Sequence, residues 1–181
     1  MKSPALLLLT ALPLLAAEPK PVTLTFYVAG VECPSCAYSV NYAIEQLKHV
    51  SEVEAGQVIE NYANVTFDPR HVTPQQIAHA VTEAVPLHGT PYEATLKLRI
   101  PAYAKADHAK RVDALFASWK DRVEAVRIDA ETGEFILHFK PLPAPPEAAG
   151  PRGWTLTELE QGLKGIPYQL SSEGLETTGA Q

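Results

Sequence analysis

Apolar side chains follow two periods that succeed each other in a fixed order through the first half of the chain. Over Thr23–Val28 they occupy every second position, which is typical of a half-buried strand. From Cys36 the spacing becomes three and four residues, the apolar stripe of a helix. Alternation over Val53–Phe67, with a turn near Glu60-Asn61, predicts a hairpin. A second helix and a short strand over Pro91–Ala94 complete the order βαββαβ.

The same order of elements follows a second time. Alternation over Thr95–Ile100 predicts a strand, and Asp107 is placed to cap the helix after it. A second hairpin is expected over Val123–Phe139, turning at Glu131-Thr132-Gly133. The second helix of each copy begins at a capping box, Thr-x-x-Gln after Thr73 and Thr-x-x-Glu after Thr155.

Two copies of one unit define the expected fold class and domain boundaries. The class is α+β, with two tandem ferredoxin-like βαββαβ sandwiches, each an antiparallel sheet carrying two helices on one face. The domains are expected at 18–94 and 95–170, joined almost without a linker at Ala94-Thr95. The second copy carries a Pro- and Ala-rich insertion over 142–153, expected to be an exposed loop, and residues 171–181 are expected to be a disordered tail.

The first 17 residues have the layout of a secretory signal peptide. A basic Met1-Lys2 start precedes an apolar run over Ala5–Leu15, which ends at the small pair Ala16-Ala17. The run is too short for a permanent transmembrane helix, so no stable membrane insertion is expected after cleavage. We therefore expect a periplasmic or secreted protein.

The charge of the chain limits its partners. Residues 18–94 hold three Lys and Arg against nine Asp and Glu, and the whole chain has a formal net charge of −6. This acidic balance argues against nucleic acid as a partner and permits docking to a basic protein surface.

Cys33 and Cys36 are the two cysteines of the chain, and their spacing is typical of a chemical site. A bridge across Cys33-Pro34-Ser35-Cys36 would close too small a loop to stabilise the fold much. Cys36 falls at the expected start of a helix, where backbone N–H groups and the helix dipole stabilise a thiolate. Two thiolates without a second Cys-x-x-Cys do not suit structural zinc, and calcium and magnesium require oxygen ligands. Soft thiolates favour soft ions, so one Cu(I) or Hg(II) is expected as cargo.

Within the first βαββαβ unit, a strand leads into Gly-x-x-Cys-x-x-Cys, from Gly30 to Cys36, and an amphipathic helix follows. This arrangement resembles the heavy-metal-associated domain. That family includes copper chaperones, copper-transporting ATPase domains and an exported mercury-binding protein. The resemblance implies an exposed loop that holds the ion on both cysteines and passes it on by ligand exchange. The partner it implies is a metal donor or acceptor protein, such as a membrane metal transporter.

Further residues are expected to support this loop. Gly30 allows a sharp turn out of the strand, and Glu32 disfavours thiolate formation weakly. The family usually has Met where this chain has Val31, and it often places an aromatic ring where Tyr92 lies. His88 shares the segment of Tyr92 and is interpreted as a solvated loop residue with a possible approach to the site. The expected supporting residues are Gly30, Val31, Glu32, Pro34, Ser35 and Tyr92.

Two other functions remain open at this stage. Cys-Pro-Ser-Cys also resembles the motif of thiol–disulfide oxidoreductases, which would make the chain a periplasmic enzyme. In a metal-free interaction protein the cysteines would be idle. We expect no enzyme activity, because the sequence offers no loop with the cis-proline that a thioredoxin fold requires.

The second copy is expected to bind no soft metal. A shift of 72 residues places Lys105 at the position of Cys33 and His108 at that of Cys36. Its apolar faces are retained, so we expect a folded scaffold or docking unit.

Overall fold

The computed structural model describes residues 20–55, 61–143, 150–170 and 177–178. In this part of the chain eight strands and four helices alternate. They are β1 Val22–Ala29, α1 Pro34–Glu45, β2 Val50–Ala55, β3 Tyr62–Phe67, α2 Pro74–Glu83, β4 Glu93–Arg99, α3 Ala106–Trp119, β5 Val123–Asp129, β6 Glu134–Phe139, α4 Leu156–Gly162, β7 Gln169–Leu170 and β8 Thr177–Thr178. This order confirms the repeated βαββαβ pattern and the α+β class.

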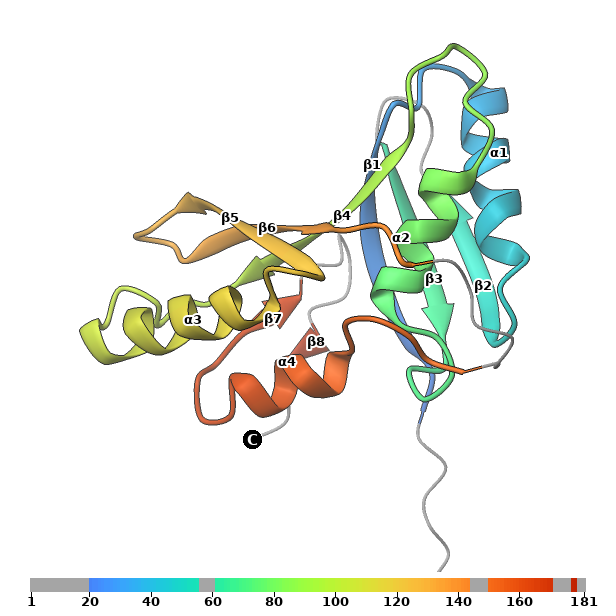
Figure 1. The fold of residues 1–181 in the computed structure, drawn as a ribbon. Coiled ribbons are helices and arrows are strands. Elements are labelled where there is room, and N and C mark those ends of the chain that lie inside the picture. Colours follow the sequence, from blue (N-terminus) through green and yellow to red (C-terminus); the bar gives the residue numbers. More distant parts are fainter. Residues whose placement is uncertain (1–19, 56–60, 144–149, 171–176, 179–181) are drawn as a thin grey trace, which may run out of the picture.

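The described strands form one continuous antiparallel sheet, in which both units share strand β4 (Figure 1). The order is β2-β3-β1-β4-β6-β5, and β7 pairs with the far end of β4. Each unit therefore has the same arrangement. Its first strand lies at the centre, its third and fourth strands flank the first, and its second strand lies at the outer edge.

The junction of the two units differs from the sequence prediction. Separate strands were expected over Pro91–Ala94 and Thr95–Ile100, but one strand, Glu93–Arg99, serves as the last of one unit and the first of the next. Its start pairs with β1 and its remainder with β6, with Thr95 paired on both sides. One extended segment can hydrogen-bond along both of its edges, so no boundary between two strands is needed.

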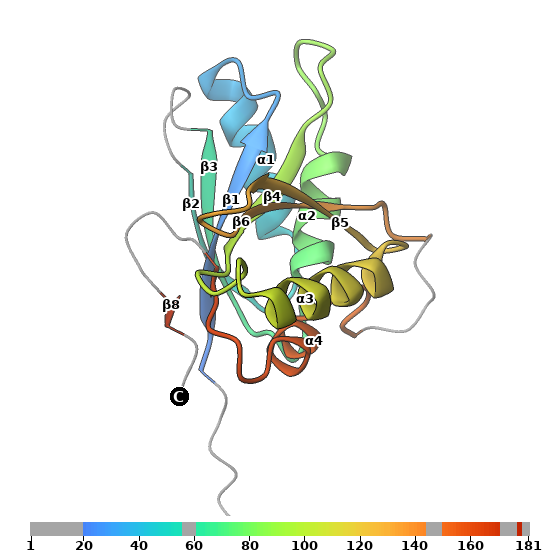
Figure 2. The ribbon, with the colours of Figure 1, turned by 90° about the vertical axis from the view of Figure 1, so that its left-hand side faces the viewer.

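Both units bury the same face of the shared strand. Ala94, Leu96 and Leu98 lie two residues apart and are at most 2% exposed, as the alternation of a strand requires. Helix α1 packs against β2 and against α2, α2 packs against the shared strand β4, and α3 packs against β5 (Figures 1 and 2). The apolar positions of the alternating runs and helix stripes that are buried include Leu24, Phe26, Val28, Val40, Ile44, Leu96, Leu98, Ile100 and Val112. Four others on the expected helix faces are only half-buried against the core: Ala43, Leu47, Leu115 and Phe116.

The helix starts follow the predicted caps with one exception. Thr73 and Thr155 both form complete capping boxes, with Gln76 and Glu158 as the reciprocal partners. Asp107, expected as the cap of the third helix, instead lies inside its first turn, and Lys105 is the N-cap without a side-chain hydrogen bond. An acidic residue there still interacts favourably with the helix dipole.

The insertion over 142–153 is not simply an exposed loop, because its described ends pack onto α2 of the first unit. Leu142 is buried, and the Arg152 carbonyl accepts a hydrogen bond from Thr73 Oγ1 at 2.6 Å. The amide of buried Gln75 donates to the Lys140 carbonyl at 2.8 Å and accepts from the Trp154 N–H at 2.8 Å. These bonds fasten the second unit to the first at a point distant from β4 in sequence.

Substitution of Gln75 by methionine keeps most of its shape and removes both hydrogen bonds. We expect the free energy of unfolding to fall by about 2–4 kcal/mol, because a backbone carbonyl and a buried N–H lose their partner. Chemical denaturation with a fluorescence readout measures this loss. The exposed control Glu83→Met on the same helix should stay within about 0.5 kcal/mol of the unmodified chain, and an equal loss in both variants would contradict the role of Gln75.

Some of the sequence predictions concern the ends of the chain and the insertion. The signal peptide at 1–17 and residues 144–149 of the insertion lie outside the described residues. Within the expected disordered tail, Thr177–Thr178 instead form β8 and pair with β7, and the remainder of the tail is outside the described part. Among the described residues, no helix has the length and apolar character needed to cross a membrane.

Candidate metal centre

The two cysteines lie where β1 passes into α1, at the end of the first unit. Gly30 ends the strand with φ +84°, and a Cβ there would approach the Pro91 carbonyl oxygen to 2.6 Å, so both turn and packing require glycine. Cys33 is the N-cap of α1 and Pro34 its first residue. Cys36 therefore sits in the first helical turn, as the sequence predicts.

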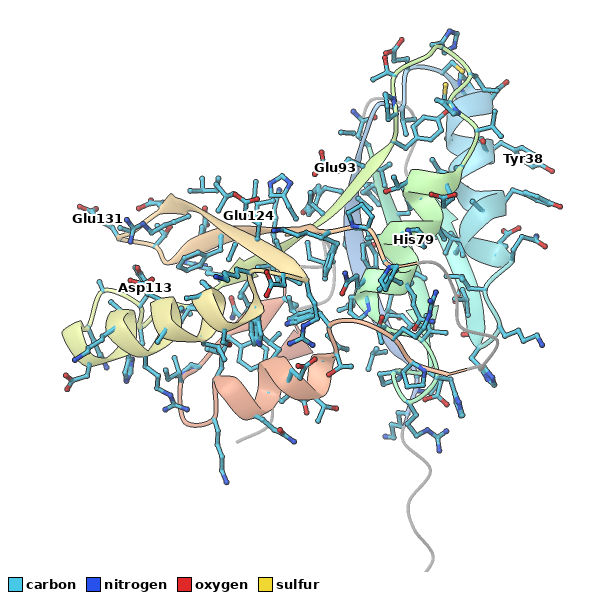
Figure 3. All side chains as sticks on the ribbon, viewed as in Figure 1. Tyr38, His79, Glu93, Asp113, Glu124 and Glu131 are labelled. Carbon is cyan, nitrogen blue, oxygen red and sulfur yellow. The ribbon has the colours of Figure 1, made fainter. Side chains whose placement is uncertain are left out.

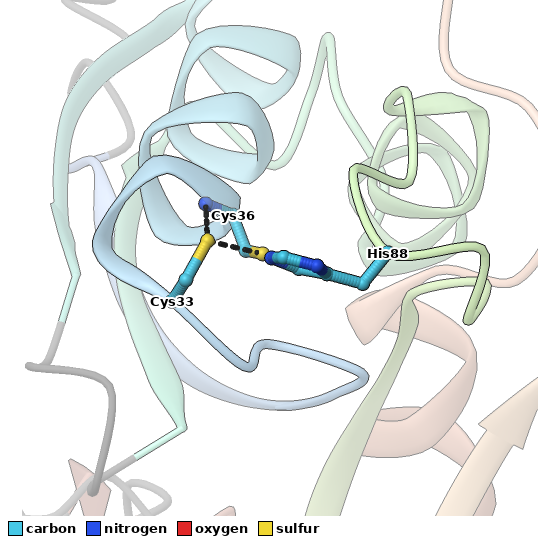
Figure 4. Close-up of side chains that lie close together, drawn as sticks. All are labelled: Cys33, Cys36 and His88. Carbon is cyan, nitrogen blue, oxygen red and sulfur yellow. Dashed lines mark hydrogen bonds between the residues drawn. The ribbon is translucent and has the colours of Figure 1, made fainter.

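The two sulfurs face each other across this turn. Cys33 Sγ and Cys36 Sγ are 2.8 Å apart, and the Cys36 N–H donates to Cys33 Sγ at 3.2 Å (Figure 4). Both thiols are free. Cys36 is 1% exposed, whereas Cys33 is half-buried and reaches the surface. The pair thus has one sulfur fixed in the core and one at the solvent boundary.

The surroundings give the two thiols different acidities. Burial raises the pKa of Cys36, but hydrogen bonds from Cys33, Tyr92 and the backbone of Glu32 outweigh it and lower the pKa to about 7. The hydrogen bond to Cys36 raises the pKa of Cys33, with burial acting in the same direction. Above pH 7 the pair therefore holds a thiolate on Cys36 while Cys33 keeps its proton.

Titration of the reduced, metal-free chain should show this asymmetry. Thiolate absorbance in the ultraviolet should rise by one equivalent near pH 7, and the second equivalent should appear only above the usual thiol pKa of 9.0. The sign follows from the stabilised anion, because a lowered pKa means that the thiolate forms earlier as the pH rises. Cys33→Ala should retain one step and shift it upward, since alanine removes the side-chain hydrogen bond that lowers the pKa of Cys36. Two steps together near pH 9 in the unmodified chain would contradict this assignment.

The remaining predicted residues surround the pair. Val31 packs against the core, Pro34 and Ser35 are exposed in the helix start, and the exposed Glu32 carboxylate accepts from Thr90 Oγ1 at 3.1 Å. Tyr92 is 2% exposed and hydrogen-bonds through its hydroxyl to Cys36. Burial, followed by that hydrogen bond, raises the pKa of Tyr92, so the phenol stays protonated beneath the sulfurs.

The structure also brings His88 to the cysteines. Its ring, on the α2–β4 segment, places a nitrogen close to both sulfurs, and the three donor atoms lie within 4.8 Å of one another (Figure 4). The sequence predicts a solvated loop residue here, and the His88 side chain is exposed, but its ring also lies beside the sulfurs. The sequence of this segment is repeated in the second unit, where Gly165-Ile166-Pro167-Tyr168 corresponds to Gly89-Thr90-Pro91-Tyr92. This repeat does not predict that His88 lies beside the cysteines.

The corresponding turn of the second unit has no sulfur ligands and is closed by its own hydrogen bonds. Lys105 caps α3 where Cys33 caps α1, confirming the shift of 72 residues. His108 Nδ1 donates to the Ala102 carbonyl at 3.1 Å. Tyr103 is buried, and its hydroxyl donates to Asp113 at 2.9 Å. Figure 3 labels Asp113 on α3.

Known structures contain similar chains. Oxidized MerP from Ralstonia metallidurans CH34 is 30% identical, with 41% of this chain and 96% of that one covered, at a TM-score of 0.36. A copper binding domain from HMA7, a P-type ATPase, is 26% identical over 40% of this chain and 90% of that one, at 0.35. The water soluble region of the P-type ATPase CopA from Bacillus subtilis is 15% identical over 89% and 98%, at 0.39. No protein-family model and no curated protein matches the chain.

The fold and the site together define a ferredoxin-like α+β protein with a Cys-x-x-Cys pair at the first turn of its first helix. The chain resembles the heavy-metal-associated domain family, because the order of elements and the Cys-x-x-Cys pair at the start of the first helix are both present in the structure. The resemblance stated on the sequence motif is thereby confirmed.

Proposed function

We propose that this protein carries one soft metal ion, Cu(I) or Hg(II), on the thiolates of Cys33 and Cys36 and passes it to a partner protein by ligand exchange. The observation that carries the proposal is the pair of free, facing sulfurs, one of them held as a thiolate near neutral pH. Thiolates are the form of cysteine that binds metals, and they favour soft ions. The copper binding domain and MerP among the similar structures support the same class of cargo.

The arrangement also supports transfer of the ion. Cys36 is buried and fixed by the helix, whereas Cys33 reaches solvent. An incoming thiolate of an acceptor can therefore approach the ion from the side of Cys33 while Cys36 still holds it. A metal donor or acceptor, such as a membrane metal transporter, fits this route, and the apolar run over residues 5–15 supports export to the periplasm or beyond.

The pattern of acidities argues against a thiol–disulfide oxidoreductase. A redox nucleophile needs a thiolate that its substrate can reach. Here the cysteine with the lowered pKa is buried, and the accessible cysteine has the raised pKa. Such a pair suits a clamp around an ion better than attack on a disulfide of another protein.

Titration of the reduced mature chain with Cu(I), against a competing chelator under anaerobic conditions, tests the proposal. We expect one tightly held equivalent per chain. Above pH 7 the ion has to displace one proton, from Cys33, and below pH 7 it has to displace a second, from Cys36. The affinity for the ion should therefore fall as the pH drops. A chain that takes up no Cu(I) and no Hg(II), and whose thiols are oxidised in its native compartment, would instead be the idle interaction protein.

A further inference from the structure

The segment between α2 and β4 is folded back over the cysteines, and several contacts hold it there. Ser39 Oγ on α1 donates to the Val85 carbonyl at 3.1 Å. The Leu87 N–H donates to the hydroxyl of Tyr92 at 3.4 Å. Thr90 reaches Glu32 on the cysteine loop at 3.1 Å. The segment is thus tied to the helix, to the residue beneath the sulfurs and to the cysteine loop itself.

His88 lies within this tethered segment, next to its turn. Gly89 follows it with φ +82°, a left-handed conformation that reverses the chain between the contact at Leu87 and the contact at Thr90. The backbone of His88 is therefore bracketed by two hydrogen bonds. Figure 4 shows its imidazole extended from this segment toward the sulfurs.

The spacing of the three donor atoms matches the size of a single ion. Metal–sulfur bonds of about 2.3 Å and metal–imidazole bonds of about 2.0 Å place donors around one ion roughly 3.5–4.6 Å apart. The Cys33, Cys36 and His88 donors all lie within 4.8 Å of one another. The sulfurs, now 2.8 Å apart, would have to separate by about 1 Å, and the half-exposed side chain of Cys33 has room to do so.

We propose that His88 is a third ligand, which makes the site a two-sulfur, one-nitrogen centre. This inference rests on the proposed function and adds to it the coordination of the cargo. Imidazole nitrogen binds copper as well as zinc, and Cu(I) accepts three ligands, whereas Hg(II) is satisfied by a linear pair of thiolates. The exposed imidazole covers the solvent side of an ion held by the buried Cys36 and is the ligand most easily displaced by a partner.

X-ray absorption of the Cu(I)-loaded chain tests the inference directly. The unmodified protein should show two sulfurs, one nitrogen and the outer-shell scattering of an imidazole ring. His88→Ala should bind Cu(I) through two sulfurs only, lose the imidazole scattering and release the ion to a competing chelator about tenfold more readily. The control His71→Ala removes another exposed histidine, on the segment before α2, and should keep the unmodified spectrum and affinity.

The outcomes separate this inference from the function on which it rests. A two-sulfur spectrum in the unmodified chain, unchanged in His88→Ala, would overturn the role of His88 and leave the metal carrier intact. A chain that binds no Cu(I), with His88 present or absent, would overturn the proposed function and the third ligand with it. Loss of imidazole scattering in His88→Ala alone establishes the ligand, because a residue that only shapes the loop leaves the nitrogen shell in place.

Discussion

Simultaneous replacement of Cys33 and Cys36 by serine is expected to abolish soft-metal binding, with a loss of affinity on the order of a thousandfold or more. Thiolate sites of structural zinc contribute roughly 10–16 kcal/mol, and serine offers no comparable anion at neutral pH. The fold should survive, because Cys36 is a small residue and Cys33 lies at the surface end of α1. Chelator competition with Cu(I) gives the affinity, and circular dichroism verifies the fold.

The second unit provides a matched control for this variant. Lys105 and His108 occupy the same two positions at the start of α3. Lys105→Ser/His108→Ser should leave Cu(I) binding unchanged, because a protonated lysine has no free lone pair and His108 is hydrogen-bonded to its own loop. A loss of Cu(I) from this control, or its retention by the double cysteine variant, would contradict a site confined to the first unit.

Trp154→Ala is expected to lower the free energy of unfolding by about 3–5 kcal/mol, the usual cost of deleting a large buried aromatic side chain. The Trp154 ring is 0% exposed and packs edge-on against Trp119 of α3, with centroids 5.4 Å apart. It also contacts Phe139 of β6, and its backbone N–H is held by Gln75 of the first unit. The substitution therefore removes aromatic packing inside the second unit, beside the backbone hydrogen bond that joins it to Gln75.

The shared strand predicts how this variant unfolds. Because β4 belongs to both units, the sheet cannot lose one half without exposing the edge of the other. Denaturation followed by thiol reactivity, which probes the first unit, and by tryptophan fluorescence, which probes the second, should give coincident transitions in the unmodified chain and in Trp154→Ala. Two separated transitions would show that the units are independent. A loss below about 1 kcal/mol would show that Trp154 is not part of the common core.

Elements with a strong local period were predictable from the sequence. The alternation of Leu24, Phe26 and Val28 and the capping boxes at Thr73 and Thr155 depend on residues a few positions apart, and the structure confirms them. The placement of the cysteines at the start of α1 follows from the same local signals. The metal-silent second unit stays a prediction, although Lys105 does cap α3 as the repeat requires.

Other features depended on contacts between distant segments. An alternating run reads the same whether it forms two strands or one, so the shared use of β4 was decided by its pairing with β1 and β6. The insertion looked exposed because its composition is typical of loops. The hydrogen bonds of Gln75 to Lys140 and Trp154 join residues at least 65 positions apart, for which no local pattern exists.

The metal site likewise combines features predictable from the sequence with features that depend on the tertiary structure. The chain order alone placed two thiols three residues apart at a helix start, where Cys33 can hydrogen-bond to Cys36. The Tyr92 hydroxyl, which also lowers the pKa of Cys36, reaches it only through the tertiary structure. The position of His88 beside them was decided by the tertiary structure. It follows from the antiparallel pairing of β1 with β4, which returns the α2–β4 segment to the end of the sheet where the cysteines lie. Periodicity describes neighbours along the chain, whereas a ligand 52 positions beyond Cys36 is brought into place only when the strands pair.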